Sequence, residues 1–503
     1  MPTFAAIDIG SNSVRLSIAE LHGGRIQLLH QDREVTRLGE GVFRNGSLDP
    51  HAMAHTISVI ERFRRAIRKF HTDHVRMVAT SAMRDAKNAH VFTDWLHTTT
   101  GWKLEVISGL EEGRLIHLGV ISKARVRTPH VLLIDLGGGS CELTLSVKGH
   151  IREMVSLPLG AVRLTQDFLR HDPPLPQELR RMHSFIGEEL DRAAPPFQNA
   201  HAAQAIATSG TAAALASASG EGVRAGPVST VKVARLACEL SKLDKDGRKA
   251  IPGINSRRAE IIVAGSAVFA ELMQRYKIKS FRYSPMGLRD GILAQMAADF
   301  DARSRSHKQM ESDREDAVKA LCRRYQVDVV HAEQVRRFAG LLYGSLRSIH
   351  QLPAEYAELI GTAAMLHESG AYVNHTGRHR HTYYLLANSE IFGYTPEQRQ
   401  RVAAIARYQG NSRPVETDPI MRNFSNQVRT EVIKAVCVLR VARALDQGRH
   451  NAVRNISTRI TSRSVQVSLR AVRTGADLEL WTAEKEVPYF RAVFGRELLF
   501  KSS

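Results

Sequence analysis

Residues 4–21 read FAAIDIGSNSVRLSIAEL, and residues 131–147 read VLLIDLGGGSCELTLSV. Each stretch has a short apolar strand, a turn rich in glycine and serine, and a second, alternating strand, which is the pattern of a β-hairpin. At an offset of 127 residues three pairs coincide: Asp8 with Asp135, Gly10 with Gly137, and Ser13 with Ser140. The duplicated hairpin predicts two similar lobes that face each other, over residues 1–127 and 128–299.

Strand and helix patterns alternate within both lobes. The expected helices lie at residues 52–70, 91–99 and 259–275, the expected strands at 75–80 and 104–108, and strand–turn–helix units at 205–218 and 281–297. Alternating strands and helices predict an α/β sheet in each lobe.

The chain after residue 299 has a different pattern. Residues 300–317 are polar and are expected to be a linker or the exposed start of a helix. Residues 318–503 are expected to form a mostly helical domain that ends in a small sheet, made by the alternating runs SVQVSL and DLELW. The longest expected helices of this domain lie at residues 331–350, 355–367, 397–408 and 428–446.

Basic residues outnumber acidic residues throughout the 503-residue chain. The 70 Lys and Arg against 51 Asp and Glu give a net charge of +19, and residues 301–503 alone carry 31 against 21, or +10. Such an excess favours polyanions: nucleic acid, phosphate-rich ligands or an acidic membrane surface. Four cysteines without a close pair argue against a disulfide framework or a cysteine-based zinc site. No signal peptide and no membrane-spanning run is visible, so a soluble cytoplasmic protein is expected.

The two hairpin turns have the composition of a phosphate site. Such turns expose consecutive backbone N–H groups, and Gly137, Gly138 and Gly139 allow a close backbone approach to a ligand. Asp8 and Asp135 end the first strands, where carboxylates could hold Mg²⁺ against bound phosphates. A plain turn explains one copy equally well, but two copies at matching positions favour the phosphate site. The chain contains no P-loop sequence.

Glu112 is the candidate general base. Ser108 and Glu111 have the spacing of a capping box at a helix start, which is a sufficient structural explanation for Glu111. Glu112 is not needed for that cap. It is either an acid that favours the helix dipole or a base directed at water in a cleft.

Further polar residues occupy positions suited to anions. Arg84 follows a strand, where it could clamp phosphate or be a solvated surface residue. Glu142 matches Arg15 in the repeat, so the pair either places opposite charges on the two walls of a cleft or faces outward. Small-residue turns at helix N-termini, which can bind anions, are Ser209-Gly210-Thr211 and residues 286–291.

Six motifs combine these residues in one order and spacing: DIGSNSVRL, TSAMR, SGLEEGRLI, DLGGGSCEL, ATSGTAAAL and SPMGLRDGIL. Together they resemble the exopolyphosphatase/guanosine pentaphosphate phosphohydrolase family over residues 4–298. The resemblance implies an α/β fold of two actin-like (ribonuclease H-like) lobes with a cleft between them. AAMLHESG, HRHTYYLLANSEIFGY and IARYQ resemble the HD-like domain that long members of this family carry.

The resemblance also implies roles for individual residues. Glu112 takes the place of the catalytic carboxylate, and Glu142 that of a second acid near the attacking water. Asp8 and Asp135 match the acidic positions that hold Mg²⁺, and a monovalent cation is a further possible ion. The residues that match phosphate-cradling turns are Ser11, Asn12, Ser13, Arg84, Gly137, Gly138, Gly139 and Ser140. Cys141 stands where threonine is commoner in the family.

The HD-like region is assessed separately. HD hydrolases bind metal through a histidine, a His-Asp pair and a further aspartate, and the candidates here are His331, His367, Glu368 and Asp446. Glu368 replaces the aspartate of the pair and adds a methylene to a site with tight metal–oxygen distances. The favoured interpretation is therefore a degenerate fold with structural histidines. A basic cluster that could bind polyanion contains His375, Arg378, His379, Arg380 and His381.

The expected activity is that of an exopolyphosphatase, which hydrolyses terminal phosphoanhydride bonds of inorganic polyphosphate and releases orthophosphate. The alternative is 5′-phosphohydrolysis of guanosine pentaphosphate (pppGpp), a nucleotide of the stringent response, through the same site, or both activities. Two remoter alternatives are a non-hydrolytic nucleotide-binding regulator, against which Glu112 and Glu142 argue, and an HD phosphohydrolase, against which Glu368 argues. The resemblance implies a homodimer, and nucleic acid is not an expected partner.

Overall fold

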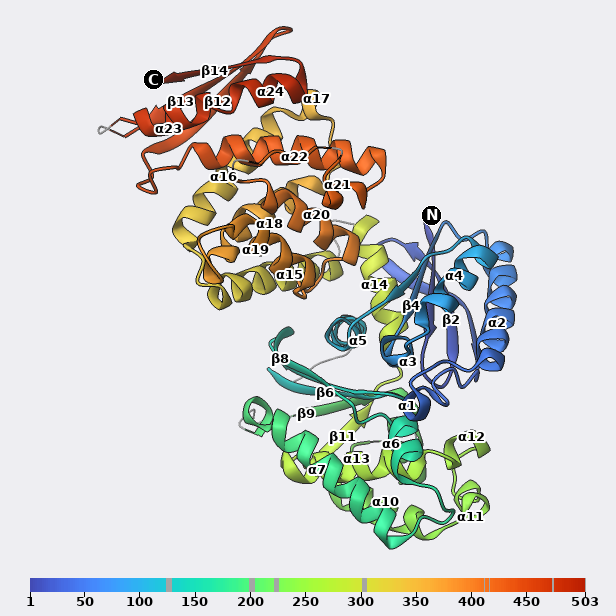
Figure 1. The fold of residues 1–503 in the computed structure, drawn as a ribbon. Coiled ribbons are helices and arrows are strands. Elements are labelled where there is room, and N and C mark those ends of the chain that lie inside the picture. Colours follow the sequence, from blue (N-terminus) through green and yellow to red (C-terminus); the bar gives the residue numbers. More distant parts are fainter. Residues whose placement is uncertain are drawn as a thin grey trace. The chain divides into compact units, whose positions relative to one another are not determined.

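A computed structural model of the chain describes residues 1–123, 129–198, 204–220, 226–300, 305–410, 412–415, 417–472 and 475–502. These residues form two compact units, Met1–Glu311 and Ser312–Ser503, which are described one at a time (Figure 1). The expected boundary between the lobes, at residues 127 and 128, lies outside the described residues, as do residues 301–304 of the expected linker. None of the described helices has the length and apolar character needed to cross a membrane.

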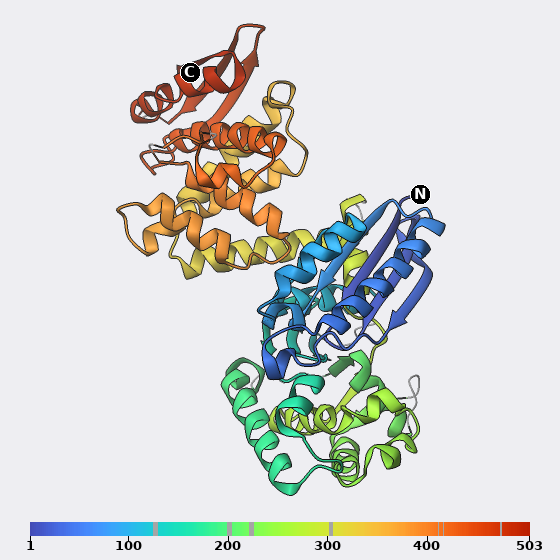
Figure 2. The ribbon, with the colours of Figure 1, turned by 45° about the vertical axis from the view of Figure 1, so that its right-hand side comes forward.

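The first lobe is built on a five-stranded sheet in the order β3-β2-β1-β4-β5. Its strands are β1 (Thr3–Ile9), β2 (Val14–His22), β3 (Arg25–Glu34), β4 (His74–Ala79) and β5 (Leu104–Val106). Helices α2 (Pro50–Lys69) and α4 (Ala89–Thr100) cover one face of the sheet (Figure 2). Asp49 fixes the start of α2, because its side chain accepts a hydrogen bond from the backbone N–H of Ala52.

The second lobe repeats this arrangement with one additional strand. Its sheet has the order β10-β11-β9-β6-β7-β8, with β6 (His130–Leu136), β7 (Cys141–Val147), β8 (His150–Leu157), β9 (Gln204–Thr208), β10 (Val228–Ser229) and β11 (Ser280–Tyr283). Three helices share a hydrophobic core with one face of the sheet: α7 (Pro176–Gln198), α10 (Thr230–Lys242) and α13 (Ile262–Arg275). The prediction of an α/β sheet in each lobe is confirmed.

The two hairpins correspond residue by residue. In the first hairpin Asp8 pairs with Arg15, and in the second Asp135 pairs with Glu142. Both turns close with the same hydrogen bond, from Gly10 N to Ser13 O at 3.1 Å and from Gly137 N to Ser140 O at 2.9 Å. An irregularity in the pairing with the third strand also recurs at the same offset, between residues 18 and 19 and between residues 145 and 146.

A central layer of two helices lies between the sheets. Helix α5 (Gly109–Lys123) follows the last strand of the first sheet, and α14 (Leu288–Phe300) follows β11 of the second. Both share a core with Phe4 and Ala6 of β1 and with Val131 and Leu133 of β6. Because side chains alternate along a strand, Asp8 and Asp135 continue these two rows and face the same central layer.

The two central helices approach each other at the level of the backbone. A Cβ atom at Gly291 would lie 1.8 Å from the carbonyl oxygen of Leu115. Glycine is therefore required at this crossing. The remaining helices of the unit are short or lie at its edges: α1 (Val42–Asn45), α3 (Ser81–Asp85), α6 (Ala161–Phe168), α8 (Ser209–Ala218), α11 (Lys245–Lys249) and α12 (Ser256–Ala259).

The second unit is mostly helical, and its core is contributed by nearly all of its elements. Its helices are α15 (Arg305–Arg324, which begins before the unit boundary), α16 (Val329–Ser345), α17 (Arg347–His350), α18 (Tyr356–Leu366), η1 (Ser369–Tyr372), α19 (Arg378–Asn388), α20 (Pro396–Arg407), α21 (Pro419–Arg422), α22 (Asn426–Ala444), α23 (Asp477–Glu484) and α24 (Val487–Phe494). Strands β12 (Val453–Ile460), β13 (Ser464–Ala471) and β14 (Glu497–Ser502) form a small sheet at the C-terminal end. Residues 305–317, expected as a linker or a helix start, belong to α15.

The prediction of one strand of the C-terminal sheet is wrong. The run DLELW forms the first part of helix α23, and the third strand is β14 instead. Asp477 and Glu479 lie in the first helical turn, where acids are favoured by the helix dipole. Leu478 and Trp481 are 47% and 58% exposed, so the alternation of apolar residues in this run does not mark one buried face.

Candidate active site

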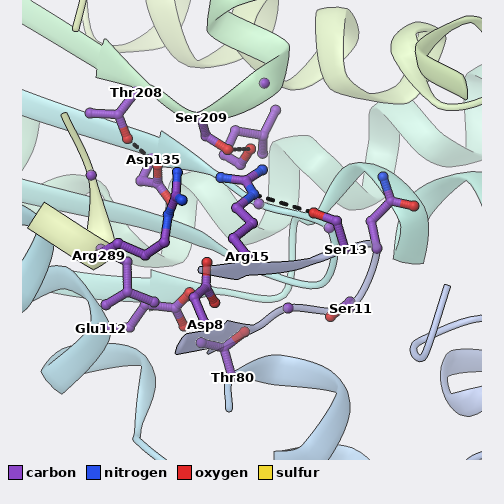
Figure 3. A pocket seen from close by; sticks show the side chains of 18 of the residues that line it. Asp8, Ser11, Ser13, Arg15, Thr80, Glu112, Asp135, Thr208, Ser209 and Arg289 are labelled. Carbon is purple, nitrogen blue, oxygen red and sulfur yellow. Dashed lines mark hydrogen bonds between the residues drawn. The ribbon is translucent and has the colours of Figure 1, made fainter. Parts of the chain in front are cut away.

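A cavity of about 300 Å³ lies between the two lobes. Its walls come from both hairpin turns, the N-terminal turn of α5, the start of α8 and the loop before α14. Figure 3 shows Asp8 and Glu112 on one side of this cavity, Asp135 and Thr208 on the other, and the Arg15 and Arg289 side chains between them. The repeat therefore places matching acids on opposite walls of one site.

Carboxylates gather at one end of the cavity. One oxygen each from Glu112, Asp135 and Glu142 lies within 4.8 Å of the others. Burial raises the pKa of Asp8 and Asp135, and it raises the pKa of Glu142 well above the usual value, with Glu112 as the next cause. Glu142 Oε1 accepts a hydrogen bond from Ser156 Oγ at 2.8 Å, and its buried Oε2 has no hydrogen-bond partner. A cation or a shared proton would stabilise this group of acids.

Glu112 has the protonation behaviour of a base for neutral solution. Its side chain is 7% exposed, and burial raises its pKa to about 7, with Arg84 opposing and Asp135 adding to the shift. A general base is most effective when its pKa is close to the working pH.

Arg84 connects Glu112 to the second hairpin. Its Nη1 donates to Glu112 Oε2 at 3.0 Å and to the Ile107 carbonyl oxygen at 2.8 Å, and its Nη2 donates to Ser140 Oγ at 3.4 Å. In this arrangement the guanidinium orients the base. Together with Glu142, it lies behind the residues that line the cavity.

The capping box expected at Ser108 is only half formed. Ser108 Oγ accepts from the backbone N–H of Glu111 at 3.1 Å, as expected. The Glu111 carboxylate instead accepts two hydrogen bonds from Arg114, at 2.8 and 2.7 Å. Arg114 is fully buried and also donates to Gln295 of α14 at 2.7 Å. Because a buried guanidinium requires a counter-charge, Glu111 belongs to the packing of α5 against α14.

Two arginines of the cavity wall, Arg33 and Arg258, are not indicated by the sequence, whereas a third, Arg289, belongs to the expected anion-binding turn at residues 286–291. Arg33 of β3 pairs across the strands with Arg15 of β2, although like charges at opposed positions are unfavourable. Burial, together with neighbouring arginines, lowers the pKa of Arg33 and of Arg258 to about 10. A concentration of buried cations indicates a site for an anion with several charges.

The cationic wall continues into a second cavity of about 300 Å³. This cavity shares Asn12, Arg33, Gly210 and Arg258 with the first, and Arg257 also lines it. The register of β2 and β3 could have revealed Arg33, whereas Arg258, in the short helix α12, carries no local signal.

Most of the phosphate-site candidates meet at the first cavity. Its lining includes Ser11, Asn12, Ser13, Arg15, Gly137, Gly138, Gly139, Ser140, Ser209 and Gly210. Thr211 lies behind Gly210, and its hydroxyl accepts from Arg258 Nη1 at 3.5 Å. Close packing explains one of the glycines, because a Cβ at Gly139 would lie 2.3 Å from Ser81 Oγ.

The four candidates of the C-terminal unit also come together, as a second cluster. His331, His367 and Asp446 are 3%, 4% and 1% exposed. His331 Nδ1 lies 2.7 Å from Asp446 Oδ2, and Arg449 Nη2 donates to Glu368 Oε1 at 2.6 Å. Burial lowers the pKa of His367 to about 4. Of the basic cluster, burial and then Arg378 lower the pKa of His379.

Known proteins match both units of the chain. The Ppx/GppA phosphatase family model matches residues 17–300, and Ppx/GppA phosphatase domain III matches residues 314–482. A Ppx/GppA family member from Aquifex aeolicus is 29% identical over 60% of this chain and 99% of its own, with a TM-score of 0.52. An exopolyphosphatase from Cytophaga hutchinsonii is 26% identical over 59% of this chain and 98% of its own, with a TM-score of 0.56.

These matches agree with the fold. The actin-like lobes that the motifs implied are confirmed, and the helical C-terminal unit corresponds to domain III. The phosphate-site candidates on the two hairpins lie within or next to the matched range. The chain belongs to the Ppx/GppA phosphatase family and is a phosphatase.

Proposed function

We propose that the protein is an exopolyphosphatase that removes orthophosphate from the end of inorganic polyphosphate. The observation that carries this proposal is the row of arginines that begins beside the carboxylates and continues into the second cavity. Polyphosphate is a linear polyanion with at least one negative charge per phosphate unit, so its charges match such a row. Among the lining residues of both cavities, Tyr283 is the single aromatic side chain, and it lines the first cavity, so none of the residues that line the second cavity offers an aromatic ring to a purine.

Binding rests on groups of this chain. The backbone N–H groups of the two hairpin turns would hold oxygens of the terminal phosphate. Arg289 would neutralise the charge of the equatorial oxygens, which is the main requirement of phosphoryl transfer. Arg15 would bind a phosphate oxygen of the substrate equally in the ground state and in the transition state. Arg33, Arg257 and Arg258 would hold the following phosphates in the second cavity.

The water that attacks the terminal phosphorus would be positioned by Glu112. Its oxygen forms the new P–O bond, the bridging oxygen leaves with the shortened chain, and Glu112 accepts the proton. Arg84 holds the Glu112 carboxylate in place. Glu142, with its strongly raised pKa, would stay protonated beside Glu112 and avoid a second negative charge next to the attacking water.

A magnesium ion fits the same acids. Burial raises the pKa values of Asp8 and Asp135, which is what buried carboxylates show when a counter-charge is missing. Oxygen ligands suit Mg²⁺, so Asp8 and Asp135 would hold it. When bound, the ion would supply charge neutralisation to the phosphate oxygens.

Hydrolysis of pppGpp at its 5′ end is the second candidate, because the second cavity adjoins the first and offers a volume of about 300 Å³ that a nucleoside could enter. Phosphate release from long polyphosphate and from pppGpp, measured in parallel at one salt concentration, tests the choice. We expect a higher kcat/KM for polyphosphate. A preference for pppGpp of about tenfold or more, equal to ~1.4 kcal/mol, would reverse the assignment.

A further inference from the structure

The second cluster of titratable side chains lies wholly within the Ser312–Ser503 unit and has no part in the hydrolysis proposed above. One donor atom each from His331, His367 and Glu368 lies within 4.8 Å of the others. Two donor atoms on one zinc ion, with bonds of ~2.0–2.3 Å, are separated by about 3–4 Å. The three side chains are therefore close to the spacing that a single ion requires.

Each imidazole uses its Nδ1 in a hydrogen bond within the unit. His331 Nδ1 is held by Asp446 Oδ2 at 2.7 Å, and His367 Nδ1 is held by the Ala364 carbonyl oxygen at 2.7 Å. Both acceptors fix the proton on Nδ1 and present the Nε2 lone pair to the other side. Histidines that bind metals are typically oriented in this way, by a carboxylate or a backbone carbonyl.

An unsatisfied buried atom points to a missing ligand. His367 is 4% exposed, and its Nε2 has no hydrogen-bond partner. Leaving such an atom unpaired costs about 1–3 kcal/mol. Glu368 is the third candidate ligand. Its Oε1 accepts a hydrogen bond from Arg449 Nη2 at 2.6 Å, which orients the carboxylate, and Oε2 is the oxygen that would bind the ion.

We propose that His331, His367 and Glu368 form a binding site for a transition-metal dication of the zinc class. Two imidazole nitrogens and one carboxylate oxygen suit Zn²⁺ and disfavour Mg²⁺ and Ca²⁺, which prefer oxygen ligands throughout. Asp446 is a positioning residue behind His331 in this arrangement, and Arg449 is one behind Glu368. The glutamate in place of the aspartate thus changes how the carboxylate reaches the ion and does not remove the ligand.

The test is metal uptake by the full-length protein. The protein is stripped with a chelator and dialysed against Zn²⁺ or Co²⁺ in excess Mg²⁺, which occupies sites made of oxygen alone. We expect one tightly held Zn²⁺ per chain, a Co²⁺ visible absorption band of nitrogen ligation, and a higher Tm with Zn²⁺ present. Wild-type protein that takes up no Zn²⁺ or Co²⁺ under these conditions overturns the proposal.

Variants assign the ion to this cluster. We expect His367→Gln and Glu368→Gln to abolish uptake and the Co²⁺ band, and Asp446→Asn to weaken affinity about 10–100-fold, as loss of a positioning partner does. The matched control is His350→Gln: His350 is equally buried in the same unit, but both of its ring nitrogens are engaged by backbone groups. Unchanged affinity in both His367→Gln and Glu368→Gln places the ion elsewhere and refutes the assignment.

Discussion

The two hairpins share register, turn closure and pairing irregularity, yet carry opposite charges at one pair of matching positions beside the cavity. Where the first hairpin carries Arg15, the second carries Glu142. Arg15 lines the cavity beside three other arginines, whereas Glu142 is buried next to Glu112. The comparison teaches that one duplicated scaffold supplies two different functions: the first copy provides positive charge for the substrate, and the second provides a buried acid beside the base Glu112.

The largest effect on activity is expected from substitution of Glu112, the base that Arg84 connects to the second hairpin. Glu112→Gln keeps the shape of the side chain and removes the proton acceptor. We expect kcat to fall ~10²–10⁴-fold, with polyphosphate binding retained. Phosphate release and equilibrium binding measure the two effects. Glu40→Gln, an exposed carboxylate of the same lobe, is the control, and near-normal turnover of a folded Glu112→Gln protein would contradict the mechanism.

The neighbouring glutamate should affect stability and not chemistry. Glu111→Gln removes the counter-charge of fully buried Arg114. Breaking a buried ion pair on one side costs ~3–5 kcal/mol, and the amide retains part of the hydrogen bonding, so we expect a loss of about 2–4 kcal/mol. The capping box inferred from the sequence alone would predict a loss of ~1 kcal/mol or less. Denaturant unfolding distinguishes these values.

The raised pKa of Glu112 also makes a prediction about pH and stability. Its value of about 7 in the folded protein lies above the usual 4.5, so its contribution to stability is complete below the usual pKa and is lost as the pH rises through about 7. Glutamine does not ionise. Glu112→Gln should therefore be more stable than wild type near pH ~8, by about 2–3 kcal/mol, and should match it near pH ~4. Unfolding curves at both pH values test the sign, and a difference that does not depend on pH would show that folding leaves the pKa of Glu112 at its usual value.

The smallest effects are expected at the matching positions of the two hairpins, Arg15 and Glu142, and they test the comparison directly. Arg15→Gln removes a charged contact to the substrate, worth ~1.5–3 kcal/mol, and should raise KM about 10–100-fold with little change in kcat. Glu142→Gln replaces an acid that its raised pKa keeps neutral, so we expect a change of less than about tenfold in kcat. Steady-state kinetics of both variants decide it. A rise in KM of about 10–100-fold for Glu142→Gln, or a fall in kcat of about 10–100-fold for Arg15→Gln, would show that the two hairpins do not have separate functions.

Local sequence patterns were sufficient to predict the part of the site that the two hairpins form. Asp8, Asp135 and the turn residues were predictable because strand, turn and offset are all properties of neighbouring residues. Arg33 and Arg258 were not, since they reach the cavity through sheet register and through a short helix distant in sequence. Glu111 was misassigned for a related reason: its partner Arg114 is local, but the burial of that partner depends on α14, more than 160 residues away. Gln295 and Arg114 become neighbours only in the folded chain.

The recurrent irregularity in the two sheets bears on ancestry. Regular strands and glycine turns arise repeatedly, because many sequences satisfy them. The register shift after the fifth paired residue of β2 and after the fifth of β7, at residues 18 and 145, is a more specific feature than a regular strand or turn. Together with the constant offset, it indicates that one ancestral half was copied and joined to itself. The two lobes are then descendants of one ancestral half. Their sequences have since diverged, and the matching positions now held by Arg15 and Glu142 are one example.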